Sequence, residues 1–382
     1  MLGVGSGGVD SLPSHLHQLI VSEIRQRGPL TVPAYMELAL YHPVHGYYTS
    51  NSRRSGRDGD FFTSVDVGSL FGEVLAIQLA DVWQALRAAG AREFQLVECG
   101  AGDGRLARDV LDAAERTHPD LYEALHVFLC DRSAPAAEAQ RANVARHASR
   151  VTTGCAGIPR GVTGAIVANE LLDALPVHRV VKRRDTLHEL HVAETNGRLY
   201  EVPLQPSTAR LQEYLSTIPV QLPEGAIAEI GLAAVDWVTD AANATSAGAV
   251  LLFDYGAEAF HLFSPRHAAG TLMSYRDHLP NARWLEAPGE RDITSHVNLT
   301  AIDMAAALAG LKKHGTVDQT YFVINLGITE VVDSASSVAA LRRRLAARTL
   351  LMPGGLGSTI KALAYSKNLS TELRGVASGR IA

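Results

Sequence analysis

The chain is poor in cysteine and has no long apolar run. Its 382 residues include three cysteines, Cys99, Cys130 and Cys155, and none of them lies in a CxxC pair. An odd number without paired spacing argues against a disulfide framework and a structural zinc site, so we expect reduced thiols and no metal. No apolar run approaches the roughly 20 residues that a membrane span needs, so no membrane partner is expected.

The first ten residues also lack the features of a targeting segment. They have no basic start, no apolar stretch and no arginine-rich amphipathic pattern. Together with reduced thiols, this predicts a cytoplasmic protein. The formal net charge of −5 argues against a general polyanion-binding surface, so we expect no nucleic-acid partner.

The N-terminal quarter is predicted to be helical. Apolar residues at helical spacing follow Ser14 and stop at Gly28, and a second short pattern ends before His42. A loop rich in glycine and arginine comes next, and a long amphipathic pattern then ends at Gly90. We interpret residues 1–92 as a helical region that includes a loop over a cofactor.

The middle of the chain alternates short apolar strands with helices. This alternation predicts an α/β fold, with a parallel sheet covered by helices on both faces. We assign this domain to residues 93–330. Its predicted strands are 94–98, 126–131, 165–168 and 250–253, and its predicted helices include 105–117 and 134–145.

Additional material interrupts this domain and follows it. Three short strands from 180 to 202 and a helix at 226–242 predict an inserted α+β subdomain at about 180–245. Farther along, 316–327 has a strand-like pattern and 334–349 a helical one, and we expect residues 331–382 to form a helical C-terminal segment.

The most informative stretch connects the first strand of the middle domain to its first helix. Gly100, Gly102 and Gly104 form a Gly-x-Gly-x-Gly loop, with Glu98 two positions before it. Glycines at a strand–loop–helix junction let the backbone approach a ligand at a helix N-terminus. The alternative is a plain tight turn, but this context favours a nucleotide site.

The loop differs from the two common phosphate-binding motifs. Arg105 occupies the sixth position, where the dinucleotide fingerprint has glycine, and no Gly-Lys-Ser/Thr follows. The pattern resembles motif I of class I methyltransferases, which implies a Rossmann-like sheet and S-adenosyl-L-methionine as the cofactor. Asp131 ends the next strand, where it would accept the ribose hydroxyls or, alternatively, cap the following helix.

Further motifs sharpen the resemblance. Their order and spacing resemble the MidA-like methyltransferase family, whose mitochondrial members assist respiratory complex I assembly by methylating an arginine. The resemblance covers about residues 30–330. The chain departs from the family pattern at Val65-Asp66 and at Ala101 and Asp103. The motifs are HPVHGYY at 42–48, GDFFTS at 59–64, FGE at 71–73, NELLDALPVH at 169–178, FDYG at 253–256, GTL at 270–272 and PGERDITSHV at 288–297.

The resemblance implies roles for several residues. It places the 59–64 segment over the cofactor, with Phe61 and Thr63 in contact with it. Asn169 is assigned to the cofactor as well. The implied acceptor is a protein arginine.

Glu170 and Asp173 are the best candidates for binding this acceptor. Asn169-Glu170 ends a buried strand, at the edge where open parallel sheets bind ligands. Two carboxylates could hold a guanidinium in a bidentate fork, and one of them could receive its proton. Alternatively, Glu170 lies near the cofactor without touching the acceptor, and Asp173 is a local cap.

Three other residues have weaker signals. His296 is a catalytic candidate because imidazole titrates near neutrality, although a lone histidine near polar residues more often has a structural role. Asp254 ends an apolar strand and is either an outer carboxylate of the site or a turn residue. Asp292 is expected to hold its loop through a local turn.

Three functions remain open on the sequence. The first is a methyltransferase that acts on protein arginine. The second is a methyltransferase for a small molecule such as a natural product. The third is an assembly or scaffold protein that keeps the fold without turnover, although the intact Glu98, glycine loop and Asp131 argue against loss of the cofactor site. The oligomeric state is not predicted.

Overall fold

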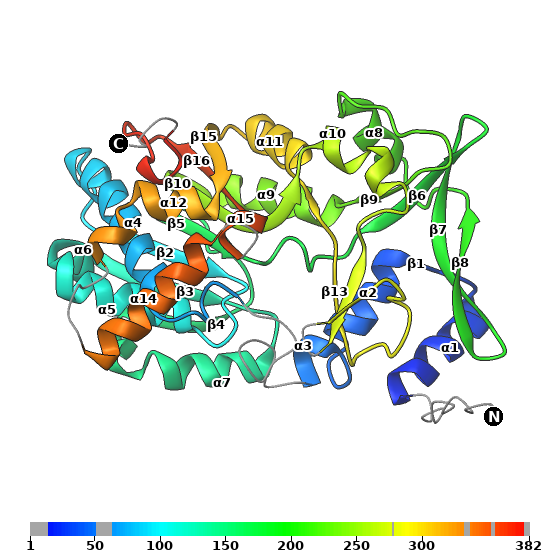
Figure 1. Ribbon diagram of the computed structural model, residues 1–382, viewed down its shortest axis with the longest axis horizontal. Helices are drawn as coiled ribbons and strands as arrows, with labels where there is room; N and C mark the ends of the chain where they lie inside the picture. The colour runs from blue at the N-terminus through cyan, green and yellow to red at the C-terminus, as the bar shows by residue number, and fades with distance from the viewer. Residues whose placement is uncertain (1–13, 51–62, 277–278, 332–336, 353–355, 378–382) are drawn as a thin grey trace, which may run out of the picture.

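The computed structural model describes residues 14–50, 63–276, 279–331, 337–352 and 356–377. Two sheets lie toward opposite ends of the long axis, and a small third sheet lies between them (Figure 1). Among the described residues, no helix is both long enough and apolar enough to cross a membrane.

The largest sheet has eight strands in the order β15-β16-β10-β5-β2-β3-β4, with β14 beside β10. Strands β10, β5, β2, β3 and β4 are mutually parallel, whereas β16 runs antiparallel between β10 and β15. The strands are β2 (Phe94–Cys99), β3 (Leu125–Cys130), β4 (Val151–Cys155), β5 (Val162–Asn169), β10 (Thr245–Ala257), β14 (Val297–Asn298), β15 (Lys312–Asp318) and β16 (Ile360–Lys367).

Helices cover both faces of this sheet. On one face, Leu79 of α4 and Leu111 of α5 share a core with Phe253 of β10. On the other face, Val238 of α9 and Ile302 of α11 share a core with Leu252. Successive residues of β10 are therefore both buried, which is why the strands read as continuous apolar runs. The helices are α4 (Leu70–Ala88), α5 (Arg105–Thr117), α6 (Pro119–Ala124), α7 (Ala134–Asn143), η1 (Ala145–Arg150), α9 (Leu232–Ala244) and α11 (Leu299–Leu308).

The other half of the molecule contains the N-terminal helices and the insertion between β5 and β10. An antiparallel sheet has the order β1-β7-β6-β9, with β8 beside β7. Ile20 of α1 and Tyr35 of α2 share a core with Val192 of β7. These elements are α1 (His15–Arg27), β1 (Leu30–Thr31), α2 (Val32–Tyr41), α3 (Tyr47–Ser50), β6 (His178–Arg183), β7 (Thr186–Thr195), β8 (Arg198–Leu204), α8 (Arg210–Thr217) and β9 (Ile227–Ile230).

A three-stranded sheet of order β12-β11-β13 joins the two halves. Ile293 of β13 belongs to the core formed by the N-terminal helices. The α/β fold with a Rossmann-like sheet, a helical N-terminal extension and an inserted α+β subdomain is thus confirmed. The remaining elements of this region are α10 (Ala259–Leu262), η2 (Pro265–His267), β11 (Met273–Arg276), β12 (Leu279–Asn281) and β13 (Asp292–Thr294).

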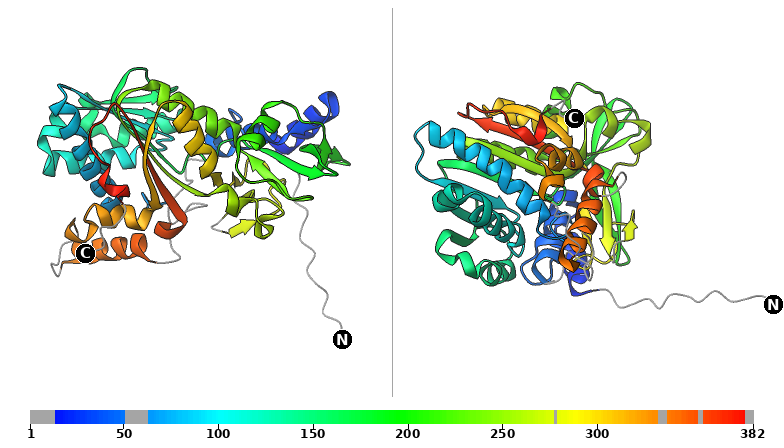
Figure 2. Two further views of the ribbon diagram at one scale, coloured as in Figure 1. Left: turned by 90° about the horizontal axis from the view of Figure 1, so that it is seen from above. Right: turned by 60° about the vertical axis from the view of Figure 1, so that its left-hand side comes forward.

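The C-terminal part departs from the sequence prediction. The strand predicted over 316–327 ends at Asp318, and α12 follows it because Phe322, Val323 and Leu326 reach the core at helical spacing. The segment 331–382 is not purely helical, since it contains β16, a strand of the central sheet. The helices α12, α13 and α14 lie on the half of the molecule that holds this sheet (Figure 2). They are α12 (Gln319–Asn325), α13 (Ile328–Val331), α14 (Val338–Leu351), α15 (Leu356–Thr359) and η3 (Arg374–Val376).

Two further differences concern the prediction of strands. The sequence analysis missed β4, and it assigned 226–242 to one helix where β9 precedes α9. Only Ile227–Ile230 leave the helix, because they pair with β6 across the antiparallel sheet. Local periodicity does not register such a long-range pairing.

Candidate functional site

The glycine loop joins β2 to α5. Gly100, Gly102 and Gly104 have φ values of 67°, 51° and 81°, in the left-handed region that favours glycine. The amides of Gly100 and Ala101 donate to the carbonyl of Cys130 at 2.9 and 3.1 Å, which fastens the loop to the end of β3. A Cβ added at Gly102 would meet no protein atom within 4 Å, so the loop is open there.

Glu98 is a buried acceptor beside this loop. Its side chain is buried, and its Oε2 atom has no hydrogen-bond partner among the described residues. Burial, then repulsion from Asp103, raises the pKa of this carboxyl to about 8, against a hydrogen bond from the backbone of Ala107. A buried carboxylate with an unmatched acceptor fits a ligand that brings a cation or a hydroxyl donor.

Asp131 follows β3 and accepts hydrogen bonds from two backbone segments. Its Oδ2 accepts the amide of Gly102 at 2.9 Å, and its Oδ1 accepts the amide of Ser133 at 2.8 Å. The helix-cap interpretation and the ribose interpretation are therefore compatible, since a carboxylate has about four acceptor positions. The same side chain holds the loop open and begins the turn into α7.

The end of β5 forms a constrained turn. Glu170 has a φ of 52°, which is unusual for a residue with a side chain, and its amide donates to the carbonyl of Phe253 at 2.7 Å. The buried carboxylate of Asp254 accepts the next two amides, from Leu171 at 3.1 Å and Leu172 at 2.7 Å. Asp254 is thus the residue that shapes the turn and presents Glu170 at the sheet edge.

Three carboxylates converge at this edge. Burial, followed by repulsion from Asp254, raises the pKa of Glu170 to about 8, while hydrogen bonds from Asn169 and the backbone of Ser64 oppose the shift. Burial also raises the pKa of Asp254 to about 7, although the amides of the turn lower it. The pKa of Asp173 is raised well above its usual range by burial and then by Asp254, with further repulsion from Asp292 and Glu170.

Tyrosines lie near these carboxylates and near Asp292. The hydroxyl of Tyr48 donates to Oδ1 of Asp292 at 2.8 Å. Repulsion from Asp173 adds to burial in raising the pKa of both Tyr255 and Tyr275. The sequence analysis did not assign these side chains to the site. Tyr48 and Asp292 both lie in family motifs, but nothing local indicates that they meet.

The predicted covering segment is described from Thr63 onward, and Phe61 lies outside the described residues. The amide and hydroxyl of Thr63 donate to Oδ2 of Asp66 at 2.9 and 3.1 Å. Asp66 in turn forms an ion pair with Arg105 at 2.8 Å. Because Arg105 begins α5, Thr63 is fastened to the helix that follows the glycine loop.

His296 is not brought together with the carboxylates. The residue as a whole is exposed, its ring lies 6.0 Å from the ring of His267, and its amide donates to Thr271. Burial of part of the ring and repulsion from His267 lower its pKa. The neighbouring residue does reach the cluster, since the Ser295 amide donates to the carbonyl of Asp173 at 2.9 Å. We therefore leave His296 out of the site.

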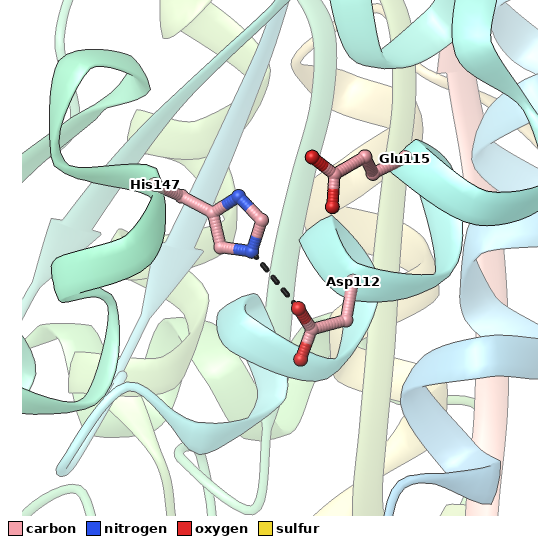
Figure 3. Close-up of side chains that lie close together, drawn as sticks. All are labelled: Asp112, Glu115 and His147. Atoms are coloured by element: carbon pink, nitrogen blue, oxygen red, sulfur yellow. Dashed lines mark hydrogen bonds and ion pairs between the residues drawn. The ribbon is translucent and has the colours of Figure 1, made fainter.

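One group of side chains has the composition of a metal site. Asp112, Glu115 and His147 converge between α5 and η1 (Figure 3). Arg146 forms ion pairs with Asp112 at 2.9 Å and with Glu115 at 2.6 Å. The Nδ1 atom of the buried His147 ring lies 2.9 Å from the hydroxyl of Tyr122. Arg146 neutralises both carboxylates, so we assign the cluster a structural role.

The loop residues fit S-adenosyl-L-methionine. The ligand offers an ammonium group and a ribose diol as donors, and the chain offers the buried, unpartnered Oε2 of Glu98 and the carboxylate of Asp131. Oδ1 of Asn169 is a further buried acceptor without a partner among the described residues. The open space over Gly102 leaves room for the ligand at the same place.

Comparison with known proteins supports this interpretation. The chain is 28% identical over 338 residues to the protein arginine methyltransferase NDUFAF7, mitochondrial, of Danio rerio, covering 81% of this chain and 76% of that protein. The human protein of the same name is 26% identical, covering 85% and 77%. These relatives are mitochondrial, so the prediction of a cytoplasmic location is wrong on this comparison. The absence of a recognisable leader pattern is a poor guide to location, because it samples only a few residues.

A solved structure agrees over nearly the whole chain. A protein from Burkholderia thailandensis bound to S-adenosyl-homocysteine has a TM-score of 0.85 and 28% identity, covering 97% of this chain and 98% of that one. A family model described as S-adenosyl-L-methionine-dependent methyltransferase matches residues 74–317. The predicted fold, cofactor and enzyme class are thus confirmed, and the chain belongs to this family of S-adenosyl-L-methionine-dependent methyltransferases.

Proposed function

We propose that this enzyme transfers the methyl group to an arginine side chain of a protein. The observation that carries the proposal is the group of buried or half-buried carboxylates at the ends of β5 and β10. Glu170, Asp173 and Asp254 repel one another electrostatically, and each has a raised pKa. The names of the relatives, which are protein arginine methyltransferases, support the same acceptor.

Charge favours a cationic acceptor at this edge. Placing several carboxylates together in a buried site is costly unless a cation offsets their repulsion. A guanidinium is always charged and has donors in a planar fork that matches a carboxylate. A neutral hydroxyl or carbon acid brings no charge to these carboxyls, which would then stay protonated.

The proposed cofactor site uses Glu98, Gly100, Gly102, Gly104, Asp131 and Asn169, with Thr63 at the covering segment. When bound, S-adenosyl-L-methionine supplies an electrophilic methyl group on a sulfonium. The chain's own residues then have to orient the acceptor in line with that group, which is where positioning contributes to the rate.

Glu170 has the properties of a proton acceptor for this reaction. The reactants carry two positive charges, one on the guanidinium and one on the sulfonium. The products are a methylated guanidinium, a neutral thioether and one proton. Burial raises the pKa of Glu170 to about 8 without a ligand, and a bound guanidinium lowers it, which favours the ionised carboxylate that accepts the proton. Asp254 contributes indirectly, since it holds the amides of Leu171 and Leu172 and thereby orients the turn.

The test is a methylation assay on cell lysate with a tritiated methyl donor. The labelled products are separated into protein and small molecules, and the protein is hydrolysed for amino-acid analysis. We expect label in methylarginine, and no label with a Gly102→Val enzyme that no longer binds the donor. Label in a small molecule would favour the natural-product alternative. Binding of S-adenosyl-homocysteine without any labelled acceptor would favour the scaffold alternative.

Glu170→Gln tests the role of the carboxylate. It keeps the shape of the side chain and removes its charge, so kcat/KM for an identified arginine substrate should fall by about 100-fold or more. Affinity for S-adenosyl-homocysteine should change by less than about tenfold. A near wild-type rate for this variant would refute the role of Glu170 and leave the acceptor class standing.

A further inference from the structure

Tyr48 and Asp292 form a pair that no local pattern predicts. Tyr48 belongs to α3 in the N-terminal region, and Asp292 begins β13, 244 residues later. Oδ1 of Asp292 accepts both the Tyr48 hydroxyl at 2.8 Å and the amide of Ile293 at 2.9 Å. The carboxylate is buried, with only 4% of the residue exposed, so these two donors fix its orientation.

This pair lies beside the carboxylates of the β5 turn. Repulsion between Asp292 and Asp173 contributes to the raised pKa of Asp173. The backbone also links the two segments, because the amide of Ser295 donates to the carbonyl of Asp173. Across the small sheet, Asp292 pairs with Tyr275, whose ring is half-buried.

The N-terminal region is fastened to the same place by a second tyrosine. Tyr41 stacks on Tyr48 with ring centroids 5.4 Å apart, and its hydroxyl donates to the carbonyl of Ala174 at 3.0 Å. The guanidinium of Arg132 lies 4.4 Å from the centroid of the Tyr41 ring. Tyr41 thus already contacts one guanidinium of the chain itself by the attraction between a cation and an aromatic face, and that guanidinium also forms an ion pair with Glu37.

These contacts place a carboxylate, held from the N-terminal region, close to the Glu170–Asp173 turn. We propose that Asp292 is a second acceptor-binding carboxylate, oriented by Tyr48, so that the substrate guanidinium lies between Asp292 and the β5 turn. The inference rests on the proposed function. It assigns part of the substrate specificity to the N-terminal helical region and the small sheet, outside the Rossmann-like domain.

The competing explanation is that the pair only fastens two segments. The chain has a matched control for it, because the hydroxyl of Tyr365 donates to Oδ1 of Asp303 at 2.7 Å on the other half of the molecule. Tyr365→Phe removes a similar part-buried bond at a distance from the site, and Asp303→Asn removes the same bond together with an ion pair to Lys313. They should lower the melting temperature without altering acceptor recognition.

The first measurement uses NMR titration to determine how tightly two small probes bind to the complex of the enzyme with S-adenosyl-homocysteine. The probes are Nα-acetyl-arginine amide and its neutral isostere, Nα-acetyl-citrulline amide. We expect the wild type to prefer arginine, and Asp292→Asn to reduce that preference by about tenfold. Tyr48→Phe keeps the charge of Asp292 and should reduce the preference for arginine by about threefold. In an Asp292→Asn background it should have little further effect. The control variants should keep the wild-type preference.

The second measurement is the rate of arginine labelling in lysate, which Asp292→Asn should lower by about 30-fold. The affinity for S-adenosyl-homocysteine should stay within about threefold. If Asp292→Asn kept the wild-type preference for arginine and the wild-type labelling rate, the inference would be overturned. Labelling of arginine by the wild type would still support the proposed function. If the wild type labelled no arginine, the proposed function would fail, and the titration, which needs no turnover, would still decide whether Asp292 selects a cation. Should Asp292→Asn fail to fold, an unchanged preference in Tyr48→Phe would refute the orienting role.

Discussion

Replacing Glu98 by glutamine should strengthen the unliganded fold and weaken cofactor binding at the same time. The carboxyl is buried, and its pKa of about 8 lies well above the ordinary value of 4.5. Between those two pH values the folded protein keeps a proton that the unfolded chain has lost. The stability of the wild type therefore falls as the pH rises through this window, and levels off above about 8.

The magnitude follows from the size of the shift. Each pKa unit corresponds to about 1.4 kcal/mol, so the full shift sets an upper limit of roughly 5 kcal/mol at alkaline pH. Glutamine has no such cost. We expect Glu98→Gln to match the wild type near pH 4.5 and to exceed its free energy of unfolding by about 2–4 kcal/mol at pH 8. Urea denaturation without ligand at both pH values measures the difference.

Cofactor binding should respond with the opposite sign. An ammonium group of the ligand is best matched by the ionised carboxylate, so the wild-type affinity for S-adenosyl-homocysteine should rise by up to about tenfold per pH unit between pH 6 and 8. Loss of one charge-assisted hydrogen bond should weaken binding by about 1.5–3 kcal/mol at pH 8 in the variant, and its pH slope should vanish. Calorimetry at three pH values tests this, with the exposed Glu93→Gln as control. An unchanged slope in Glu98→Gln, or a loss of stability at pH 8, would refute the reasoning.

Three other substitutions separate binding from folding. Gly102→Val should abolish detectable binding of S-adenosyl-homocysteine while lowering unliganded stability by only about 1–3 kcal/mol, because its Cβ would meet no protein atom within 4 Å although the residue is strained at a φ of 51°. Intact binding in calorimetry would contradict this. Asp131→Ala should weaken the same binding by about 1.5–3 kcal/mol. It should also cost about 1 kcal/mol of unliganded stability, since the amides of Gly102 and Ser133 lose their acceptor. Gly164→Ala should lower the free energy of unfolding in urea by more than about 3 kcal/mol, because its Cβ would lie 2.1 Å from the carbonyl oxygen of Gln95. A stable variant would show that the strands can shift.

The parts of the fold that depend on near neighbours were predictable. The glycine loop, Glu98 before it and Asp131 after β3 all occupy positions that a strand–loop–helix pattern specifies. The stretch around Leu252 is equally clear, since both faces of a parallel strand are buried. The sequence analysis also missed β16, which is buried at its centre and lies between β10 and β15 through pairing with distant segments.

The candidate site divides in the same way. Glu170 and Asp173 were expected because Glu170 ends a buried strand and Asp173 follows three residues later. The role of Asp254 was left open, and the structure resolves it in favour of the turn, where its carboxylate accepts two backbone amides. The Asp292–Tyr48 hydrogen bond was not expected, because a local turn would satisfy Asp292 equally well in the sequence.

The sequence by itself determined most strands and helices of the α/β core, the glycine loop and the family, because these depend on periodicity and on residues a few positions apart. The tertiary structure decided which carboxylates meet and what their pKa values become. The pKa of Asp173 depends on burial and on Asp254 and Asp292, which lie 81 and 119 positions away in the chain. Coulomb interactions act through space and grow stronger away from water, so the charge of this site becomes defined only when the N-terminal helices, the small sheet and the ends of β5 and β10 pack together.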